Sequence, residues 1–549
     1  MDDTEPTAAA PLRHAGDVTI AALARRGIDT MFTLNGGHVW PFYDAARHLG
    51  VRVVDTRHEQ TAVFAAEGYA KLTRTPGLAV LTAGPGVTNG VSAITSAHVS
   101  GTPLVALGGR APQMRWGSGS LQEFDHVPVL APITKMARTL TDPMQAAALA
   151  EELVTTALTA HRGPVFADYP LDGFGPLDTQ LPLPRPIVSV EADSDAVTRA
   201  AVLIAGAERP ACIVGSDVYW AGAWEALAAA AANLRLPCWF NGLGRGCLTG
   251  GHPLSFLRTR SMVKAEADVV VVIGAPLDFR LSFGNFGSAK VIHVVDSQSQ
   301  RAAHVEAEMT IVGDLRAVLA AWGDHAAASA GERRDHEPWI ERLRVAEDEA
   351  IAIDDSALGS AAFPIAPSRI YGELRRRLEP NAVVICDGGD FGSYAGKYVE
   401  VQRPGCWLDT GPYGCLGNGP GYAIAARIAR PHSQIVLLLG DGAAGFSLMD
   451  ADTMVRHKLP VVMIVGNNGI WGLEKHPMQF IYGWDVGCDL QPRCRYDEVV
   501  RALGGAGEIV TQPDEIGPAL DRAFESGVPY LVNVMTDPAD MYPRSTNLG

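Results

Sequence analysis

An acidic residue and an amide residue follow two apolar runs in the last third of the chain. The run QIVLLL leads into Gly440-Asp441-Gly442, and the run VVMIVG leads into Asn467-Asn468. If the two runs are neighbouring parallel strands, Asp441 and Asn468 meet at one edge of the sheet. Their oxygens, together with a backbone carbonyl, are hard ligands that suit Mg²⁺, and Mg²⁺ takes phosphate oxygens as further partners.

Small residues follow the acid of the first motif. Gly442, Ala443 and Ala444 allow backbone N–H groups to approach a phosphate at the start of a helix. Alone, each motif would be interpreted as an ordinary turn. The two motifs together, each directly after a strand, predict a site for a metal ion and a diphosphate.

The elements that position these motifs repeat one theme, an apolar run followed by a glycine turn and a helix-like segment. Short apolar strands that alternate with helices indicate parallel sheets covered on both faces. Proline-rich breaks at 176–188 and 361–369 indicate linkers. We therefore predict three doubly wound α/β domains with parallel sheets, over residues 1–178, 189–345 and 362–549.

Composition excludes several classes of protein. The formal net charge of −16 argues against nucleic acid or an anionic membrane as the main partner. The apolar runs are far shorter than the roughly 20 residues of a membrane span. Eight cysteines without a C-x-x-C motif predict reduced thiols, and the start lacks the pattern of a signal peptide. We expect a cytoplasmic protein that acts on a small molecule.

The double motif resembles that of the thiamine diphosphate superfamily, which includes pyruvate decarboxylase, acetolactate synthase, oxalyl-CoA decarboxylase and 2-hydroxyacyl-CoA lyase. The resemblance extends over nearly the whole chain. It implies a pyrimidine-binding domain at 1–178, a Rossmann-like middle domain at 189–345 and a diphosphate- and Mg²⁺-binding domain at 362–549. Thiamine diphosphate and Mg²⁺ are the implied cofactors.

The resemblance also implies roles for single residues. Asp441, Asn468 and the carbonyl of Ile470 are the implied metal ligands. The implied cofactor-binding positions are Pro85, Asn89, Asp390, Phe391, Gly414, Leu416, Gly442, Ala443, Ala444 and Leu473. Among these, Leu416 would force a bent cofactor, and the Gly414 carbonyl would accept a hydrogen bond from its amino group.

Glu59 is the candidate for activating the cofactor. It lies between an apolar strand and a helix, in VRVVDTRHEQTAVFAAEGYAKL. A carboxylate beside the aminopyrimidine can favour the tautomer that removes the acidic proton of the thiazolium ring. The family's activating glutamate occupies the same pattern. Alternatively, Glu59 is a first-turn acid favoured by the helix dipole.

Three further residues are candidates for the substrate side of the site. His38, in LNGGHVW, is either catalytic or structural. Gln122, after Leu121 in GSGSLQEF, either binds a substrate carbonyl or satisfies buried backbone. Glu474 either transfers a proton, for which a raised pKa would suit it, or is an exposed acid that pairs with Lys475.

The choice of substrate depends on departures from the acetolactate synthase pattern. The segment GLEKHPMQF replaces the usual M-V-x-Q-W, and GAPLDFRLSFG at 274–284 is closer to 2-hydroxyacyl-CoA lyases. Residues 408–426 and the C-terminal YPRSTNLG resemble an actinobacterial subgroup often labelled acetolactate synthase, some members of which cleave 2-hydroxyacyl-CoA. The sequence therefore favours a 2-hydroxyacyl-CoA lyase that gives formyl-CoA and an aldehyde or ketone, with Arg544 as a candidate phosphate contact.

Other functions remain as alternatives. The first is an acetolactate synthase-like enzyme that condenses 2-oxoacids, and the second is a catalytically inactive thiamine-binding regulator. The middle domain lacks G-x-G-x-x-G, so an NAD dehydrogenase is excluded, and this domain binds ADP or FAD, through Asp296, or nothing. The family also implies a dimer, or a dimer of dimers, in which two chains share each active site.

Overall fold

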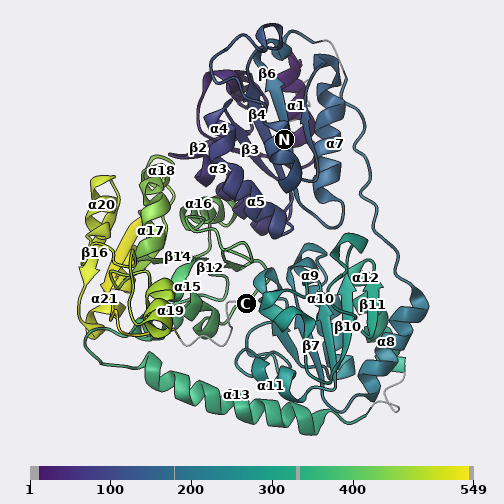
Figure 1. Ribbon diagram of the computed structural model, residues 1–549, viewed down its shortest axis with the longest axis vertical. Coiled ribbons are helices and arrows are strands. Elements are labelled where there is room, and N and C mark those ends of the chain that lie inside the picture. The colour runs from purple at the N-terminus through teal and green to yellow at the C-terminus, as the bar shows by residue number, and fades with distance from the viewer. Residues whose placement is uncertain (1–10, 178–179, 329–333, 543–549) are drawn as a thin grey trace, which may run out of the picture. The chain divides into compact units, whose positions relative to one another are not determined.

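Three β-sheets organise the chain (Figure 1). The computed structural model describes residues 11–177, 180–328 and 334–542, so the predicted phosphate contact Arg544 lies outside the described residues. All the strand pairs recorded among these residues are parallel. The predicted fold class is confirmed, and one sheet lies within each of the three predicted domain ranges.

The first sheet has six strands in the order β2-β1-β3-β4-β6-β5. Every residue of β3 and β4 is buried, as expected for central strands with helices on both faces. The strands are β1 Thr30–Thr33, β2 Arg52–Asp55, β3 Gly77–Leu81, β4 Leu104–Arg110, β5 Ala137–Thr139 and β6 Pro164–Pro170. The helices are α1 Ala15–Ala24, α2 Trp40–Leu49, α3 Glu59–Thr73, α4 Pro85–Asn89, α5 Val91–Val99, α6 Val127–Leu130 and α7 Ala146–Leu158.

The second sheet has five strands in the order β11-β10-β9-β7-β8. Its central strand β9 reads VVVVI and is completely buried. The strands are β7 Pro210–Val214, β8 Cys238–Phe240, β9 Val269–Ile273, β10 Lys290–Val295 and β11 Met309–Val312. The helices are α8 Ser194–Gly206, α9 Ser216–Trp220, α10 Trp224–Leu234, α11 Arg260–Glu266, α12 Leu315–Ala328 and α13 Glu337–Leu358.

The third sheet has six strands in the order β13-β12-β14-β15-β17-β16. The strands are β12 Val383–Asp387, β13 Trp407–Leu408, β14 Ile435–Gly440, β15 Val462–Asn467, β16 Ala506–Val510 and β17 Tyr530–Met535. The helices are α14 Pro367–Arg375, α15 Gly389–Tyr398, α16 Gly419–Ala429, α17 Asp441–Ser447, α18 Ala451–Arg456, α19 Gly472–Tyr482, α20 Tyr496–Ala502 and α21 Ile516–Glu525. Strands β12, β14 and β15 are direct neighbours, so the loops that follow them share one edge.

The compact units of the chain differ from the three predicted ranges. One unit comprises Met1–Ile187 with Gly411–Ala429 and Met449–His457, and the other comprises Val188–Thr410, Arg430–Leu448 and Lys458–Gly549. Two segments of the predicted third domain therefore belong to the unit that contains the first sheet. The boundaries at 178, 189, 345 and 362 stay a prediction.

Close packing between α3 and α16 explains why the first unit includes α16. A Cβ on Gly421 would lie 2.7 Å from the Cβ of Phe64, and one on Gly68 would lie 2.9 Å from the ring of Tyr422. The buried Lys71 ammonium donates to the Tyr422 hydroxyl over 2.8 Å. Glycine lets the two helix backbones approach to this distance, and no larger residue fits there.

Helix α13 continues through the predicted domain end at residue 345. Trp339, Ile340 and Leu343 are buried on one of its faces. Beyond them, Glu347 accepts the backbone N–H groups of Arg258 and Thr259 at 3.0 and 3.1 Å. This anchoring of both halves keeps the segment helical.

Among the described residues, no helix combines the length and apolar character that crossing a bilayer requires.

Candidate active site

Three polar side chains gather where the neighbouring strands β12, β14 and β15 end. Asp390 lies in the first turn of α15, after β12, and Asp441 is the first residue of α17, after β14. Asn468 directly follows β15. The parallel register pairs Gly440 with Gly466, which brings the two loops level with each other. We call these three residues and the backbone around them the acidic corner.

Hydrogen bonds hold the acidic corner together. Asp441 Oδ2 accepts the N–H of Gly469 at 2.7 Å, which ties the end of β14 to the loop after β15. The side-chain amide of Asn468 donates to Asp390 Oδ2 at 3.3 Å. Asn468 Oδ1 accepts the N–H of Ile470 at 3.2 Å. The predicted metal ligands Asp441, Asn468 and Ile470 therefore belong to one continuous network.

The electrostatics of the acidic corner favour a bound cation. Burial raises the pKa of Asp441 to about 6, and the negative charge of Asp390 contributes to this rise. Burial also raises the pKa of Asp390. Two desolvated carboxylates that repel each other are stabilised in their charged forms by a nearby positive charge. The donor set consists of oxygen atoms, which suits a hard divalent ion.

The start of α17 consists of small residues packed closely against Trp471. Gly442, Ala443 and Ala444 form its buried first turn. A Cβ on Gly442 would lie 2.5 Å from the ring of Trp471, so a larger residue cannot occupy this position. The N–H of Gly442 donates to Asp441 Oδ1 at 3.1 Å. N–H groups at the start of a helix carry partial positive charge, which suits an anion such as a phosphate.

The other predicted residues of this unit lie in different environments. The ring of Phe391 is buried in the core against Gly466, and its backbone N–H donates to Asp390 Oδ1. Leu473 is half-buried and Glu474 is exposed, and both lie in the first turn of α19. The proton-transfer role of Glu474 stays a prediction.

Glu59 and its partners belong to the other compact unit. Glu59 is the first residue of α3, and its residue surface is 7% exposed. The side-chain amide of Asn89 donates to Glu59 Oε2 at 3.0 Å, and a Cβ on Gly86 would lie 3.7 Å from Oε1. Pro85 is exposed at the start of α4. The structure therefore brings together Glu59 and the predicted loop residue Asn89.

His38 and Gln122 lie beside the same loop. His38 is buried, and a Cβ on Gly109 would lie 2.5 Å from its Cβ. Burial lowers the pKa of His38 below 6.5, although a bond with the backbone of Leu121 opposes this shift. Gln122 has a φ of +57° and approaches Gly84, where an added Cβ would lie 3.0 Å from its own Cβ. Leu121 itself is 77% exposed.

Gly414 and Leu416 lie in the loop before α16. Gly414 is exposed with a φ of +68°, and Leu416 is half-buried. The side chain of Gln60, next to Glu59, donates to the Leu416 carbonyl at 3.4 Å. The loop is thus connected to the start of α3 within one compact unit.

Sequence reasoning missed a buried network behind the loop that contains Gly84. The N–H of Gly84 donates to His126 Nε2 at 3.0 Å, and His126 Nδ1 lies 2.8 Å from Asp168 Oδ2. Arg110 donates to the same carboxylate oxygen at 3.1 Å. An isolated histidine four residues after Gln122 and an acid at the end of a buried strand were the only signals.

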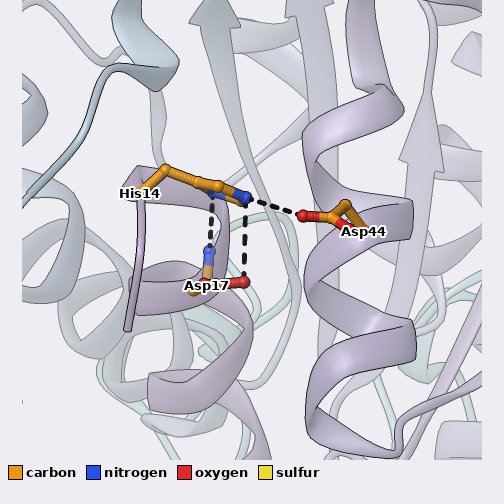
Figure 2. Close-up of side chains that lie close together, drawn as sticks. All are labelled: His14, Asp17 and Asp44. Atoms are coloured by element: carbon orange, nitrogen blue, oxygen red, sulfur yellow. Dashed lines mark hydrogen bonds and ion pairs between the residues drawn. The ribbon is translucent and has the colours of Figure 1, made fainter. Parts of the chain in front are cut away.

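A second group of possible metal ligands lies at the start of α1. His14 Nε2 lies 3.2 Å from Asp44 Oδ2 and 3.8 Å from Asp17 Oδ1 (Figure 2). Arg13 already pairs with both carboxylates, at 2.7 Å to Asp17 and 2.8 Å to Asp44. His14 Nδ1 also accepts the N–H of Asp17 as a helix cap. We therefore interpret this group as a capping network.

Comparison with known proteins agrees with this geometry. Three family models match the chain: the N-terminal TPP binding domain of thiamine pyrophosphate enzymes at residues 13–129, the central domain at 197–322 and the C-terminal TPP binding domain at 387–534. The unit with Glu59 contains the first matched range. The acidic corner lies within the last.

Similar proteins align over almost the whole chain. The acetolactate synthase large subunit IlvG of Mycobacterium tuberculosis and the probable acetolactate synthase of Mycobacterium bovis are each 48% identical over 548 residues, 99% of this chain and of each relative. The 2-hydroxyacyl-CoA lyase 2 of Homo sapiens is 31% identical, covering 97% of this chain and 91% of that protein. The chain belongs to the thiamine pyrophosphate enzyme family and is a thiamine diphosphate-dependent enzyme of carbon–carbon bond chemistry.

Proposed function

We propose that the protein condenses two 2-oxoacids with loss of carbon dioxide, as an acetolactate synthase-like enzyme. The observation that carries this proposal is the 48% identity, over 99% of both chains, to proteins named acetolactate synthase. The proteins named 2-hydroxyacyl-CoA lyase are more distant, at 31%. This order of sequence identities favours the condensation of 2-oxoacids, which the sequence motifs alone had favoured less than the lyase reaction.

The acidic corner is the proposed site for Mg²⁺ and the cofactor's diphosphate. Asp441, Asn468 and the Ile470 carbonyl would hold the ion, and Asp390 would lie beside it. Backbone N–H groups of Gly442–Ala444 would bind phosphate oxygens. The desolvated carboxylates and the position of these residues at the start of a helix support this assignment.

Glu59 and Asn89 form the proposed site for the aminopyrimidine ring. Thiamine diphosphate supplies a nucleophilic carbon and accommodates the electron pair that decarboxylation leaves behind. Glu59 would hold a proton at the ring nitrogen, and Asn89 would orient its carboxylate through the 3.0 Å hydrogen bond. Gly414 and Leu416, in the loop connected to Gln60, would contact the same cofactor.

Two neutral groups and one acid are the proposed substrate contacts. Burial lowers the pKa of His38, which favours the neutral imidazole, and this form can still donate a hydrogen bond to a substrate oxygen. Gln122, beside Gly84, can orient a carbonyl group. Glu474, exposed at the start of α19, can exchange a proton with the product hydroxyl.

A direct assay of both reactions tests the proposal. The purified protein, with thiamine diphosphate and Mg²⁺, is incubated with pyruvate in one series and with 2-hydroxyacyl-CoA thioesters in another. We expect acetolactate and carbon dioxide from pyruvate, and loss of both in the Glu59→Gln variant. Formyl-CoA release without acetolactate formation would contradict the condensing reaction.

The 2-hydroxyacyl-CoA lyase is the second candidate. The segment GLEKHPMQF and the residues 274–284 favour it, because both depart from the acetolactate synthase pattern. The alignments with the Bos taurus and Homo sapiens proteins of this name each cover 91% of those proteins. The second series of the assay measures this activity directly.

We also propose that the second sheet binds the anionic part of ADP or FAD. Asp296 follows β10 and is buried. Burial lowers the pKa of Arg260 to about 10 and also lowers the pKa of Arg245, which lies in the loop after β8. A phosphate would stabilise these desolvated cations. A yellow protein, or a nucleotide released on denaturation, would support this proposal.

A further inference from the structure

His126 is completely buried between a backbone amide and a carboxylate. The N–H of Gly84 points at Nε2 over 3.0 Å, and Asp168 Oδ2 lies 2.8 Å from Nδ1. Both His126 and Asp168 have 0% exposed surface. The side chain of Arg110, 7% exposed, donates to the same carboxylate oxygen at 3.1 Å and lies over the ring of Trp116.

This arrangement determines where the imidazole proton lies. A backbone N–H can only donate, so Nε2 must be the unprotonated acceptor. The ring proton therefore lies on Nδ1, where the Asp168 carboxylate accepts it. The carboxylate thus selects the tautomer that can hold Gly84, and Arg110 balances its charge.

Gly84 connects the buried His126 to the segment that contains Asn89. Its φ is +60° and its ψ is −112°, a conformation that other residues rarely adopt. Helix α4 begins at the next residue and ends at Asn89, whose amide donates to Glu59 Oε2 at 3.0 Å. A shift of Gly84 would therefore move the group that orients the Glu59 carboxylate.

We propose that His126, held by Asp168, is a positioning residue that sets the Gly84–Asn89 segment and, through Asn89, the orientation of Glu59. The proposal rests on the proposed role of Glu59 in activating the cofactor. His126 touches neither cofactor nor substrate in this role. It acts through one hydrogen bond to the backbone.

Two substitutions separate the hydrogen bond from the volume of the side chain. His126→Phe keeps a flat ring but has no acceptor, whereas His126→Gln places an amide oxygen near the position of Nε2. The first readout is amide hydrogen exchange in the cofactor-free protein, followed in the peptide that contains Gly84. We expect exchange to be at least about tenfold faster in His126→Phe and close to wild type in His126→Gln.

The second readout is the rate at which the bound cofactor exchanges its acidic carbon-bound hydrogen for deuterium. This rate reports on Glu59 and requires no substrate. We expect it to fall about 10- to 100-fold in His126→Phe, as for other residues that orient a catalytic group, and to be largely restored in His126→Gln. The kcat should fall more than the KM rises.

A third variant covers the case in which His126→Phe does not fold. Asp168→Asn preserves size but no longer selects the Nδ1–H tautomer, so it should show the same pair of changes to a smaller degree. His432→Phe, at an exposed position, is the matched control and should behave as wild type. Wild-type Gly84 exchange and cofactor deuteration in the folded His126→Phe and Asp168→Asn variants would overturn the proposal.

The outcomes also distinguish this proposal from the proposed function. If Glu59→Gln retained the wild-type rate of cofactor deuteration, the proposed role of Glu59 would be wrong, whatever rate the His126→Phe variant showed. If Glu59→Gln lost this deuteration while His126→Phe kept it, the positioning role alone would fail.

Discussion

Single residues at strand ends form the proposed metal site of this protein. Asp441 and Asn468 lie at the ends of paired strands and are connected through Gly469 and Asp390. Burial raises the pKa of Asp441 and of Asp390, although hydrogen bonds from neighbouring groups partly oppose this rise. A bound cation would stabilise both carboxylates in their charged forms.

Removal of the negative charge of Asp441 should strongly weaken the binding of Mg²⁺ and thiamine diphosphate. We expect Asp441→Asn to lower the Mg²⁺-dependent affinity for thiamine diphosphate by about 100-fold or more, because direct ligands contribute at least as much as the groups that orient them. Calorimetric titration of the cofactor-free protein measures the affinity. Asp514→Asn, at an exposed position, is the control. Equal affinities for both variants would exclude Asp441 as a ligand.

At the scale of elements, helix packing determines how the loops near Glu59 are held. Helix α3 begins with Glu59 and contacts α16 through glycines, and α16 follows the loop with Gly414 and Leu416. At these positions any side chain larger than that of glycine would push the two helices apart, because its Cβ would overlap with buried atoms of the facing helix.

The substitution Gly421→Ala tests this contact. The added methyl group would lie 2.7 Å from the Cβ of Phe64, and such overpacking typically costs about 1–3 kcal/mol of unfolding free energy. Urea unfolding followed by tryptophan fluorescence measures the change. Gly206→Ala is the matched control, since its Cβ would meet no atom within 4 Å. A Gly421→Ala variant as stable as this control would contradict the tight packing.

The capping network of α1 predicts a pH dependence of stability. Burial of Asp17 raises its pKa, but hydrogen bonds from Arg13 outweigh this and leave the pKa below 3.8. A lowered folded-state pKa means that ionised Asp17 stabilises the fold above the unfolded pKa. This contribution is lost as the pH falls through the folded value.

Calorimetry of Asp17→Asn measures that contribution. We expect a lower Tm than wild type at pH 7, and a difference that shrinks as the pH falls below 3.8 and through the lower folded-state pKa. The neighbouring Asp44→Asn variant reports on the second carboxylate of the group in Figure 2. A Tm difference that does not change with pH would show that the charge of Asp17 does not matter.

At the scale of the whole molecule, the predicted site residues belong to two compact units. Glu59 and Asn89 lie in one unit, and the acidic corner lies in the other. We propose that the protein is a dimer, or a dimer of dimers, in which Glu59 of one chain completes the acidic corner of another. Sedimentation of the fully active protein as a monomer would refute this.

Mixing two inactive variants tests the shared site. Glu59→Gln and Asp441→Asn should each lack activity as homodimers. After subunit exchange, a mixed dimer contains one intact site, so activity should recover to about a quarter of wild type. The measurement is acetolactate formation before and after exchange. No recovery, despite mixed dimers detected by native mass spectrometry, would indicate that each chain forms its own site.

The sequence by itself determined the three parallel sheets, because continuous apolar runs such as VVVVI and IVLLLG have few other stable arrangements. It also placed Asp441 and Asn468 at one edge of the sheet, since both directly follow strands that are consecutive in the chain and pair in parallel. Glu59, at the start of its helix, was predicted from its pattern. These features depend on local periodicity and on neighbouring elements.

Only the tertiary structure decided the contacts between distant segments. The bond between Gly84 and His126, the carboxylate of Asp168 behind it and the approach of Gly421 to Phe64 join residues far apart in the chain. An isolated histidine has no periodicity that reveals its partner. Such contacts depend on the distances at which whole sheets and helices pack, and these distances are set by the assembled core.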